Sequence, residues 1–147
     1  MRKALSLAAV VVAGFFACCC NAGRKGAAGF HLPDGDAANG RAVFVAMKCH
    51  ACHRVADLDL EAPVVDPPVP VVLGGKVAYS RTDGELVAAI VDPSHRLAPG
   101  YPPAAVRTGD LSRMGEFGDA MTVRQLIDVV AFLQSRYEVV PAPLPMK

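Results

Sequence analysis

The segment Cys49-His50-Ala51-Cys52-His53 constrains what this chain can fold into more than any other feature of the sequence. It has the form C-x-x-C-H, the sequence at which c-type haem is attached. On a helix its first, fourth and fifth residues share one face. Two thiols there can add to the two haem vinyl groups, and the histidine can donate a ring nitrogen to the iron. We therefore predict one covalent haem c, held by Cys49, Cys52 and His53.

Two other kinds of site also use a pair of cysteines at this spacing. A thioredoxin-like disulfide occurs in a β-α-β setting, which the sequence does not suggest. A zinc site needs further ligands at defined spacing, and His31 and His95 are isolated residues. Both remain as weaker alternatives to haem. His50 occupies a variable position of the motif, and we expect it at the surface, pointing away from the iron.

The N-terminus has the form of a secretory signal. Arg2 and Lys3 precede an apolar run over residues 4–17, which is typical of exported proteins. The run is shorter than the roughly 20 residues of a membrane-spanning helix, although an N-terminal membrane anchor is the alternative. Because haem c is attached outside the cytoplasm, export agrees with the motif. We expect a periplasmic or other extracytoplasmic location.

The end of this run suggests how the signal is removed. Phe15-Phe16-Ala17-Cys18 resembles a bacterial lipobox, with Phe15 at the usual leucine position. Cys18 would then be the lipidated first residue of the mature protein, and its acyl chains would hold the protein at a membrane surface. The alternative is an ordinary cleavage near Ala22.

Composition and helix signals indicate one mainly helical domain. Hydrophobic residues make up 52% of the chain, which excludes wholesale disorder, and a formal net charge of +1 gives no electrostatic case for a nucleic-acid partner. N-cap signals predict helices beginning at Asp36, Thr82 and Thr122, the last reaching about Tyr137. Proline-rich residues 54–80 favour loop, and no run alternates as a strand does. The predicted division is a signal peptide at 1–17, a Gly/Ala-rich tether at 18–35, the domain at 36–138 and a Pro-rich tail at 139–147.

The motif and its flanking helices resemble the class I (monohaem) cytochromes c over residues 36–137. Gly40 and Phe44 have the family's Gly-x-x-x-Phe spacing, and residues 126–133 resemble its terminal helix, with Phe132 at the aromatic position. The resemblance implies an all-α cytochrome c fold, with three to five short helices and long loops wrapped around one covalent haem. It also implies that the first helix crosses the last at Gly40.

The resemblance implies a methionine as second axial ligand, in the loop before the terminal helix. Met114 lies in a segment similar to the family's Met-Pro-x-Phe-Gly, with Gly115 at the proline position. Met121 is an alternative that can instead pack as a hydrophobic staple. His95 or an open iron site are further alternatives. A methionine ligand raises the reduction potential relative to two histidines.

The resemblance also implies groups that support the haem. In the family a proline carbonyl accepts from the second nitrogen of the axial histidine, which fixes the ring. Spacing to Gly74 assigns this role to Pro70, with Pro68 as the alternative. Tyr79 and Arg81 are placed to reach a haem propionate, although an exposed arginine is an equally simple interpretation.

The predicted function is transfer of single electrons between extracytoplasmic redox proteins, with no catalytic residues. An alternative is a haem subunit that works only within a larger respiratory oxidoreductase complex. A haem peroxidase needs an open iron site and usually a second haem, and only one C-x-x-C-H is present. A gas or redox sensor is the last alternative. In each case the haem supplies ring surface that a chain with 6% aromatic residues lacks, so we expect no stable domain without it.

Overall fold

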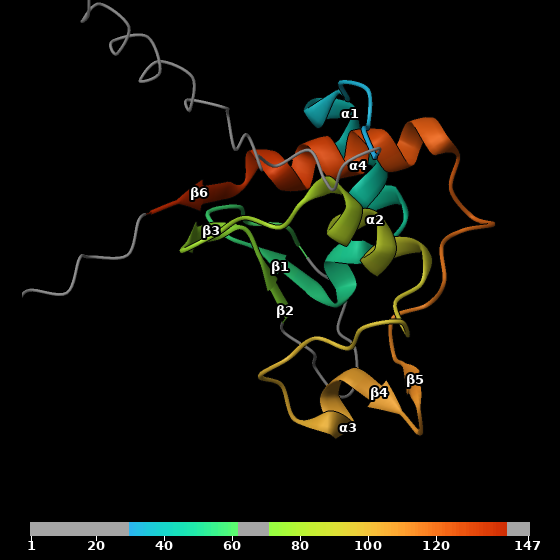
Figure 1. Cartoon of the computed structure of the whole chain (residues 1–147). Helices are drawn as coiled ribbons and strands as arrows, with labels where there is room; N and C mark the ends of the chain where they lie inside the picture. Colours follow the sequence, from blue (N-terminus) through green and yellow to red (C-terminus); the bar gives the residue numbers. More distant parts are fainter. Residues whose placement is uncertain (1–29, 62–70, 141–147) are drawn as a thin grey trace, which may run out of the picture.

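The computed structural model describes residues 30–61 and 71–140, and Figure 1 shows their arrangement. Four α-helices lie within these residues, together with one short 3₁₀ helix, η1. The helices are α1 (Ala37–Ala46), α2 (Asp83–Val91), α3 (Pro103–Val106) and α4 (Val123–Ser135), and η1 is Cys49–Ala51. The prediction of a mainly helical chain with long loops is confirmed. In the described part of the chain, no helix is both long enough and apolar enough to span a bilayer.

The three predicted helices begin where their cap residues placed them. The Asp36 side chain accepts hydrogen bonds from the backbone N–H groups of Ala38 and Asn39 at the start of α1. Thr82 and Thr122 each form a capping box, with Glu85 in α2 and Gln125 in α4. Caps are local interactions between near neighbours, which is why the sequence alone predicts them.

Helices α1 and α4 cross in close contact, and the core lies around this crossing (Figure 1). The rings of Phe44 and Phe132 have centroids 5.5 Å apart and are tilted by 59°, a separation within the favourable range for an aromatic pair. The carboxylate of Asp128 in α4 also reaches back to α1, accepting from the Asp36 N–H at 2.9 Å and from Asn39 Nδ2 at 2.7 Å. The first and last helices are therefore joined by apolar packing and by hydrogen bonds.

Six short strands were not predicted. They form three two-stranded sheets, of which β1–β2 and β3–β6 are parallel and β4–β5 is antiparallel. Each strand has only two or three residues, too few to show an alternating pattern. Their bounds are β1 His53–Val55, β2 Val71–Leu73, β3 Gly75–Val77, β4 Arg107–Thr108, β5 Leu111–Ser112 and β6 Tyr137–Val139.

The helices differ from the prediction in two places. The last helix ends at Ser135, and Tyr137 instead begins β6, which pairs with β3. The pairing needs close contact at Gly74, because a Cβ there would lie 2.8 Å from the Arg136 carbonyl oxygen, and its φ is +81°. The one-turn helix α3 was missed because four residues carry no helical periodicity.

Candidate haem site

The C-x-x-C-H motif does not lie on an α-helix, contrary to the geometry assumed from its spacing. Helix α1 ends at Ala46, and Lys48 adopts a left-handed conformation with φ +58° that stops it. The first three motif residues then form η1, and His53 begins β1. In a 3₁₀ helix residues three apart are eclipsed, so Cys49 and Cys52 still share a side. The turn rather than a helix face therefore presents the two thiols.

Cys49 and Cys52 are free thiols that differ in exposure. Cys49 is half-buried against the core, whereas Cys52 is exposed. Burial raises the pKa of the Cys49 thiol, and the neighbouring Cys52 acts in the same direction. No disulfide joins them. Two free thiols on one short turn suit covalent attachment of a flat apolar group.

His53 follows the two cysteines at the start of β1, and its surroundings keep its ring uncharged. Burial lowers the pKa of its ring, with a smaller opposing effect from the Val71 backbone. A lowered pKa keeps the imidazole neutral at neutral pH, with a lone pair available for iron. Its buried Nδ1 has no hydrogen-bond partner at proper geometry among the described residues. Val71 is the β2 partner of His53 in the sheet, and this pairing brings its backbone near the ring.

Several predicted residues lie outside the described part of the chain. They are Pro70 and its alternative Pro68, and Cys18 with the rest of the signal and tether. The carbonyl that would accept from His53 therefore stays a prediction. The register of β1 with β2 does bring the segment that follows Pro70 alongside His53.

Met114 and Met121 are both half-buried and both pack against the core. The burial of the two side chains therefore does not show which methionine is the better candidate for the axial ligand. Met114 follows β5, and its backbone N–H donates to Ser112 Oγ at 3.1 Å. Met121 directly precedes the cap of α4. The third candidate, His95, is exposed, and its backbone N–H donates to the Asp92 carbonyl at 3.1 Å.

Two serines that were not predicted as site residues hold the Met114 loop. The N–H of Ser112 donates to Ser94 Oγ at 3.1 Å, across 18 residues of chain. The contact from Met114 to Ser112 is a local serine turn, which a Ser two residues before the methionine could have indicated. The contact from Ser112 to Ser94 depends on the tertiary fold and has no sequence signal.

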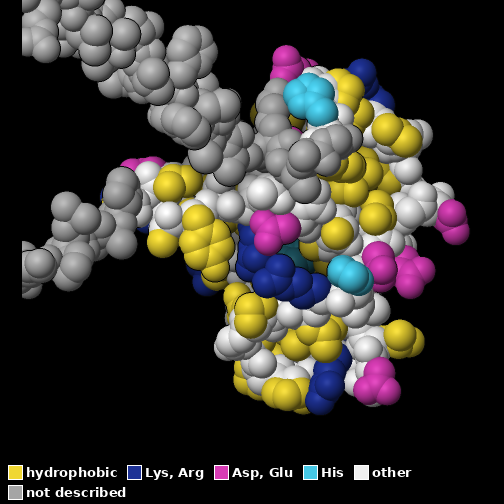
Figure 2. All heavy atoms as spheres, viewed as in Figure 1, with side chains coloured by type: hydrophobic (Ala, Val, Ile, Leu, Met, Phe, Trp, Pro, Cys, Tyr) yellow, Lys and Arg dark blue, Asp and Glu magenta, His cyan; other side chains and the backbone are white. Residues whose placement is uncertain are grey.

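Arg81 lies in a small ionic cluster rather than being freely solvated. Its Nη1 is 3.6 Å from Glu85 Oε1, and Arg96 Nη1 is 3.5 Å from the same oxygen. The hydrogen bond from the Thr82 N–H lowers the pKa of the Glu85 carboxyl, and the positive charges of Arg81 and Arg96 lower it further. Tyr79, its predicted companion, is 73% exposed and lines a hollow of about 350 Å³ with Arg81. Figure 2 shows one face of the molecule, on which basic side chains gather near the middle, beside acidic and histidine side chains.

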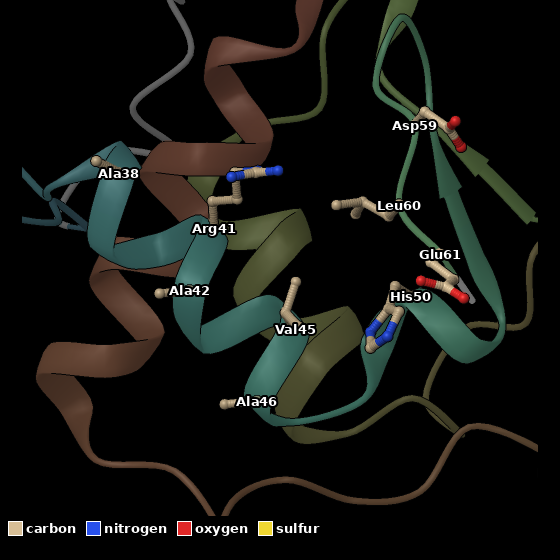
Figure 3. Close-up of a pocket in the computed structure, with 9 residues that line it drawn as sticks. All are labelled: Ala38, Arg41, Ala42, Val45, Ala46, His50, Asp59, Leu60 and Glu61. Atoms are coloured by element: carbon tan, nitrogen blue, oxygen red, sulfur yellow. The ribbon is translucent and has the colours of Figure 1, made fainter. Parts of the chain in front are cut away.

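A separate hollow of about 620 Å³ lies on the outer side of α1 (Figure 3). Arg41 and Leu60 point toward one another across it, and Glu61 lies beside His50. Its lining includes neither the two thiols nor His53 or Met114, so it is not the haem site. His50 is half-buried there rather than a plain surface residue, and its buried Nδ1 lacks a partner within the described segments.

These residues fit a haem of the c type. The chain supplies two free thiols on one turn, a neutral imidazole with an unpartnered nitrogen, and a half-buried thioether in a loop. Thiols form the covalent links, and histidine with methionine is a ligand pair found in c-type cytochromes. Cys49, Cys52 and His53 would hold the haem, and two half-buried methionines, Met114 and Met121, lie in the segment before α4.

Comparison with known proteins identifies one family. The family model described as Cytochrome c matches residues 37–136. The match takes in α1, the C-x-x-C-H turn, the Met114 loop and α4. No curated protein and no solved structure matches the chain.

Proposed function

This chain belongs to the cytochrome c family, and we propose that it carries single electrons on a haem whose iron is bound by His53 and Met114. Membership confirms the predicted fold class and the haem c cofactor. It supports electron transfer as the general function. The axial pair, the redox partners and the location belong to the proposal.

The observation that carries the proposal is the state of His53. His53 is half-buried, and burial lowers the pKa of its ring, so the chain presents a neutral imidazole directly after the two attachment thiols. Its Nδ1 is buried without a partner beside the β2 segment, where the predicted proline carbonyl would accept from it. The other ring nitrogen, Nε2, is then the one that would bind the iron, as the C-x-x-C-H motif implies.

The remaining residues determine how such a site would behave. A bound haem supplies reversible one-electron exchange, and its potential depends on axial ligands, burial and nearby hydrogen bonds. Met114 favours the ferrous state because thioether sulfur is a soft, neutral donor. Met114 and Cys49 pack against the apolar core, and burial of this kind is one of the factors that set the potential of a bound haem.

Carbon monoxide binding to the reduced protein tests this function against a sensor or a peroxidase. An electron carrier with both axial positions filled binds carbon monoxide slowly and weakly, while it exchanges one electron reversibly in a redox titration. Rapid, tight binding by the unmodified protein would contradict the proposal and favour a sensor or an enzyme. Met114→Ala is the matched control, because its open iron position must bind carbon monoxide readily.

The proposed partners are redox proteins outside the cytoplasm. A formal net charge of +1 provides no strong field to steer them. Co-purification from native membranes would separate a mobile carrier from a fixed subunit. A carrier is recovered alone, whereas a subunit stays with its oxidoreductase at a fixed ratio.

We further propose that Cys18 is lipidated and holds the domain at a membrane surface. The support is the sequence alone, namely the apolar run and the Ala17-Cys18 pair. Cys18→Ala should release the protein from the membrane fraction, with Cys19→Ala as the matched control that stays bound. Retention of the Cys18→Ala protein would contradict the lipid anchor.

A further inference from the structure

We propose that Ser94 and Ser112 are positioning residues that fix the backbone of Met114 and so hold its thioether on the iron. The inference rests on the proposed ligation by Met114. It concerns two hydroxyl groups outside the motifs by which the chain resembles its family.

The two serines form a chain of hydrogen bonds that ends at the ligand. The Met114 N–H donates to Ser112 Oγ at 3.1 Å, and the Ser112 N–H donates to Ser94 Oγ at 3.1 Å. All three residues are half-buried. Each hydroxyl accepts from a backbone group, so the relay restrains the main chain directly before the sulfur-bearing side chain.

The far end of the relay is anchored by α2. Ser94 follows Pro93, which is buried, just after α2 ends at Val91. The backbone N–H of Asp92 donates to the Ala88 carbonyl at 2.9 Å, which ties this segment to the last turn of the helix. Because α2 packs on α4 through the core, Ser94 is a fixed point in the domain.

The end of the relay at Ser112 and Met114 is held by the β4–β5 hairpin. Ser112 pairs with Arg107 across β4 and β5. The Arg113 N–H donates to the Val106 carbonyl at 2.9 Å. The backbone N–H of each of residues 112–114 therefore donates a hydrogen bond.

Gly115, the residue after Met114, explains why the hydrogen bonds from the two serines matter. Gly115 takes the place that proline has in the similar family segment, and a Cβ there would meet nothing within 4 Å. Glycine leaves the backbone freer than proline does. Restraint of Met114 must then come from the preceding side, where the two serines lie.

Imidazole competition tests the relay, because free imidazole binds ferric iron when the methionine leaves. We expect Ser112→Ala and Ser94→Ala in the full-length holoprotein to bind imidazole about three- to tenfold more tightly, as follows from the loss of one hydrogen bond. Ser112→Thr should restore the original affinity, because it keeps the hydroxyl. The Met114 amide should exchange with solvent faster in Ser112→Ala.

Ser135→Ala is the matched control. It removes a hydroxyl whose hydrogen bond to the Phe132 carbonyl measures 2.6 Å, in α4 and away from the Met114 loop. It should leave imidazole affinity unchanged even where it lowers stability. Serine variants that match this control would overturn the relay, provided that Met114→Ala does raise the affinity. If Met114→Ala leaves the imidazole affinity unchanged, the proposed ligation by Met114 is contradicted, and the proposed role of the two serines is contradicted with it.

Discussion

Gly40 in α1 lies so close to the backbone carbonyl of Asp128 in α4 that a methyl group at Gly40 would overlap it. The same methyl group would lie 2.9 Å from the Phe132 Cβ. Only a residue without a side chain permits this approach of two helices. The crossing that the family resemblance implied at Gly40 is therefore confirmed in the structure.

Gly40→Ala should lower the free energy of unfolding by about 1–3 kcal/mol or more, because a backbone carbonyl cannot move aside as a side chain can. Urea unfolding of the holoprotein measures it. Gly84→Ala is the matched control in α2, where a Cβ would be 3.6 Å from the Phe30 ring, an ordinary contact. It should be neutral or stabilising by up to about 1 kcal/mol. Equal effects at the two glycines would contradict the packing account.

Asp128 should make the domain sensitive to acid. Hydrogen bonds from the Asp36 N–H and from Asn39 lower the pKa of its carboxyl below the ordinary 3.8. A carboxyl with a lowered folded-state pKa stabilises the fold above the unfolded-state pKa. That stability is lost as pH falls through the folded-state value. Unfolding midpoints measured from neutral pH to about pH 3 should fall less steeply for Asp128→Asn than for the unchanged protein. An identical slope would contradict the assignment.

Gln134 should matter because it joins the end of α4 to the start of α2. Its Nε2 donates to the Arg81 carbonyl at 2.8 Å and to Asp83 Oδ1 at 2.9 Å, and both Gln134 and Asp83 are buried. Gln134→Leu should cost about 1–3 kcal/mol by leaving these acceptors unpaired. Gln134→Glu should cost more, since it places a second carboxylate beside Asp83. Thermal unfolding gives the order, and a Glu variant more stable than the Leu variant would contradict it.

Removal of the haem should abolish cooperative folding. The described residues bury only ten hydrophobic side chains, most of them in α1, α2 and α4. A core of that size is marginal for a domain of this length, so a ligand that binds only the folded state contributes heavily. A Cys49→Ala, Cys52→Ala double variant without haem should show no sharp thermal transition by circular dichroism. A sharp transition at the original temperature would contradict this.

The features that could be predicted from the sequence are set by near neighbours in the chain or by one residue type at one position. Asp36, Thr82 and Thr122 begin their helices because a cap bonds to groups two or three residues away. The helix crossing at Gly40 could be predicted because the Gly40 and Phe44 spacing carries the resemblance to a family in which the first and last helices cross at this glycine.

The remaining features depend on long-range contacts. The left-handed Lys48 that ends α1 before the haem motif has no sequence signal, because lysine seldom adopts that conformation. The β3–β6 pairing joins residues about sixty apart through strands of three residues. The Ser94–Ser112 contact likewise exists only once α2 and the hairpin are in place.

The absorption spectrum of the ferric protein tests the central claim most directly. Methionine sulfur bound to ferric haem gives a weak band in the red, which is absent when another ligand or water replaces it. We predict that Met114→Ala removes this band and that Met121→Ala, the matched control, retains it. A band that persists in Met114→Ala would contradict the assignment of the axial ligand, and its loss in Met121→Ala alone would place the ligand at Met121.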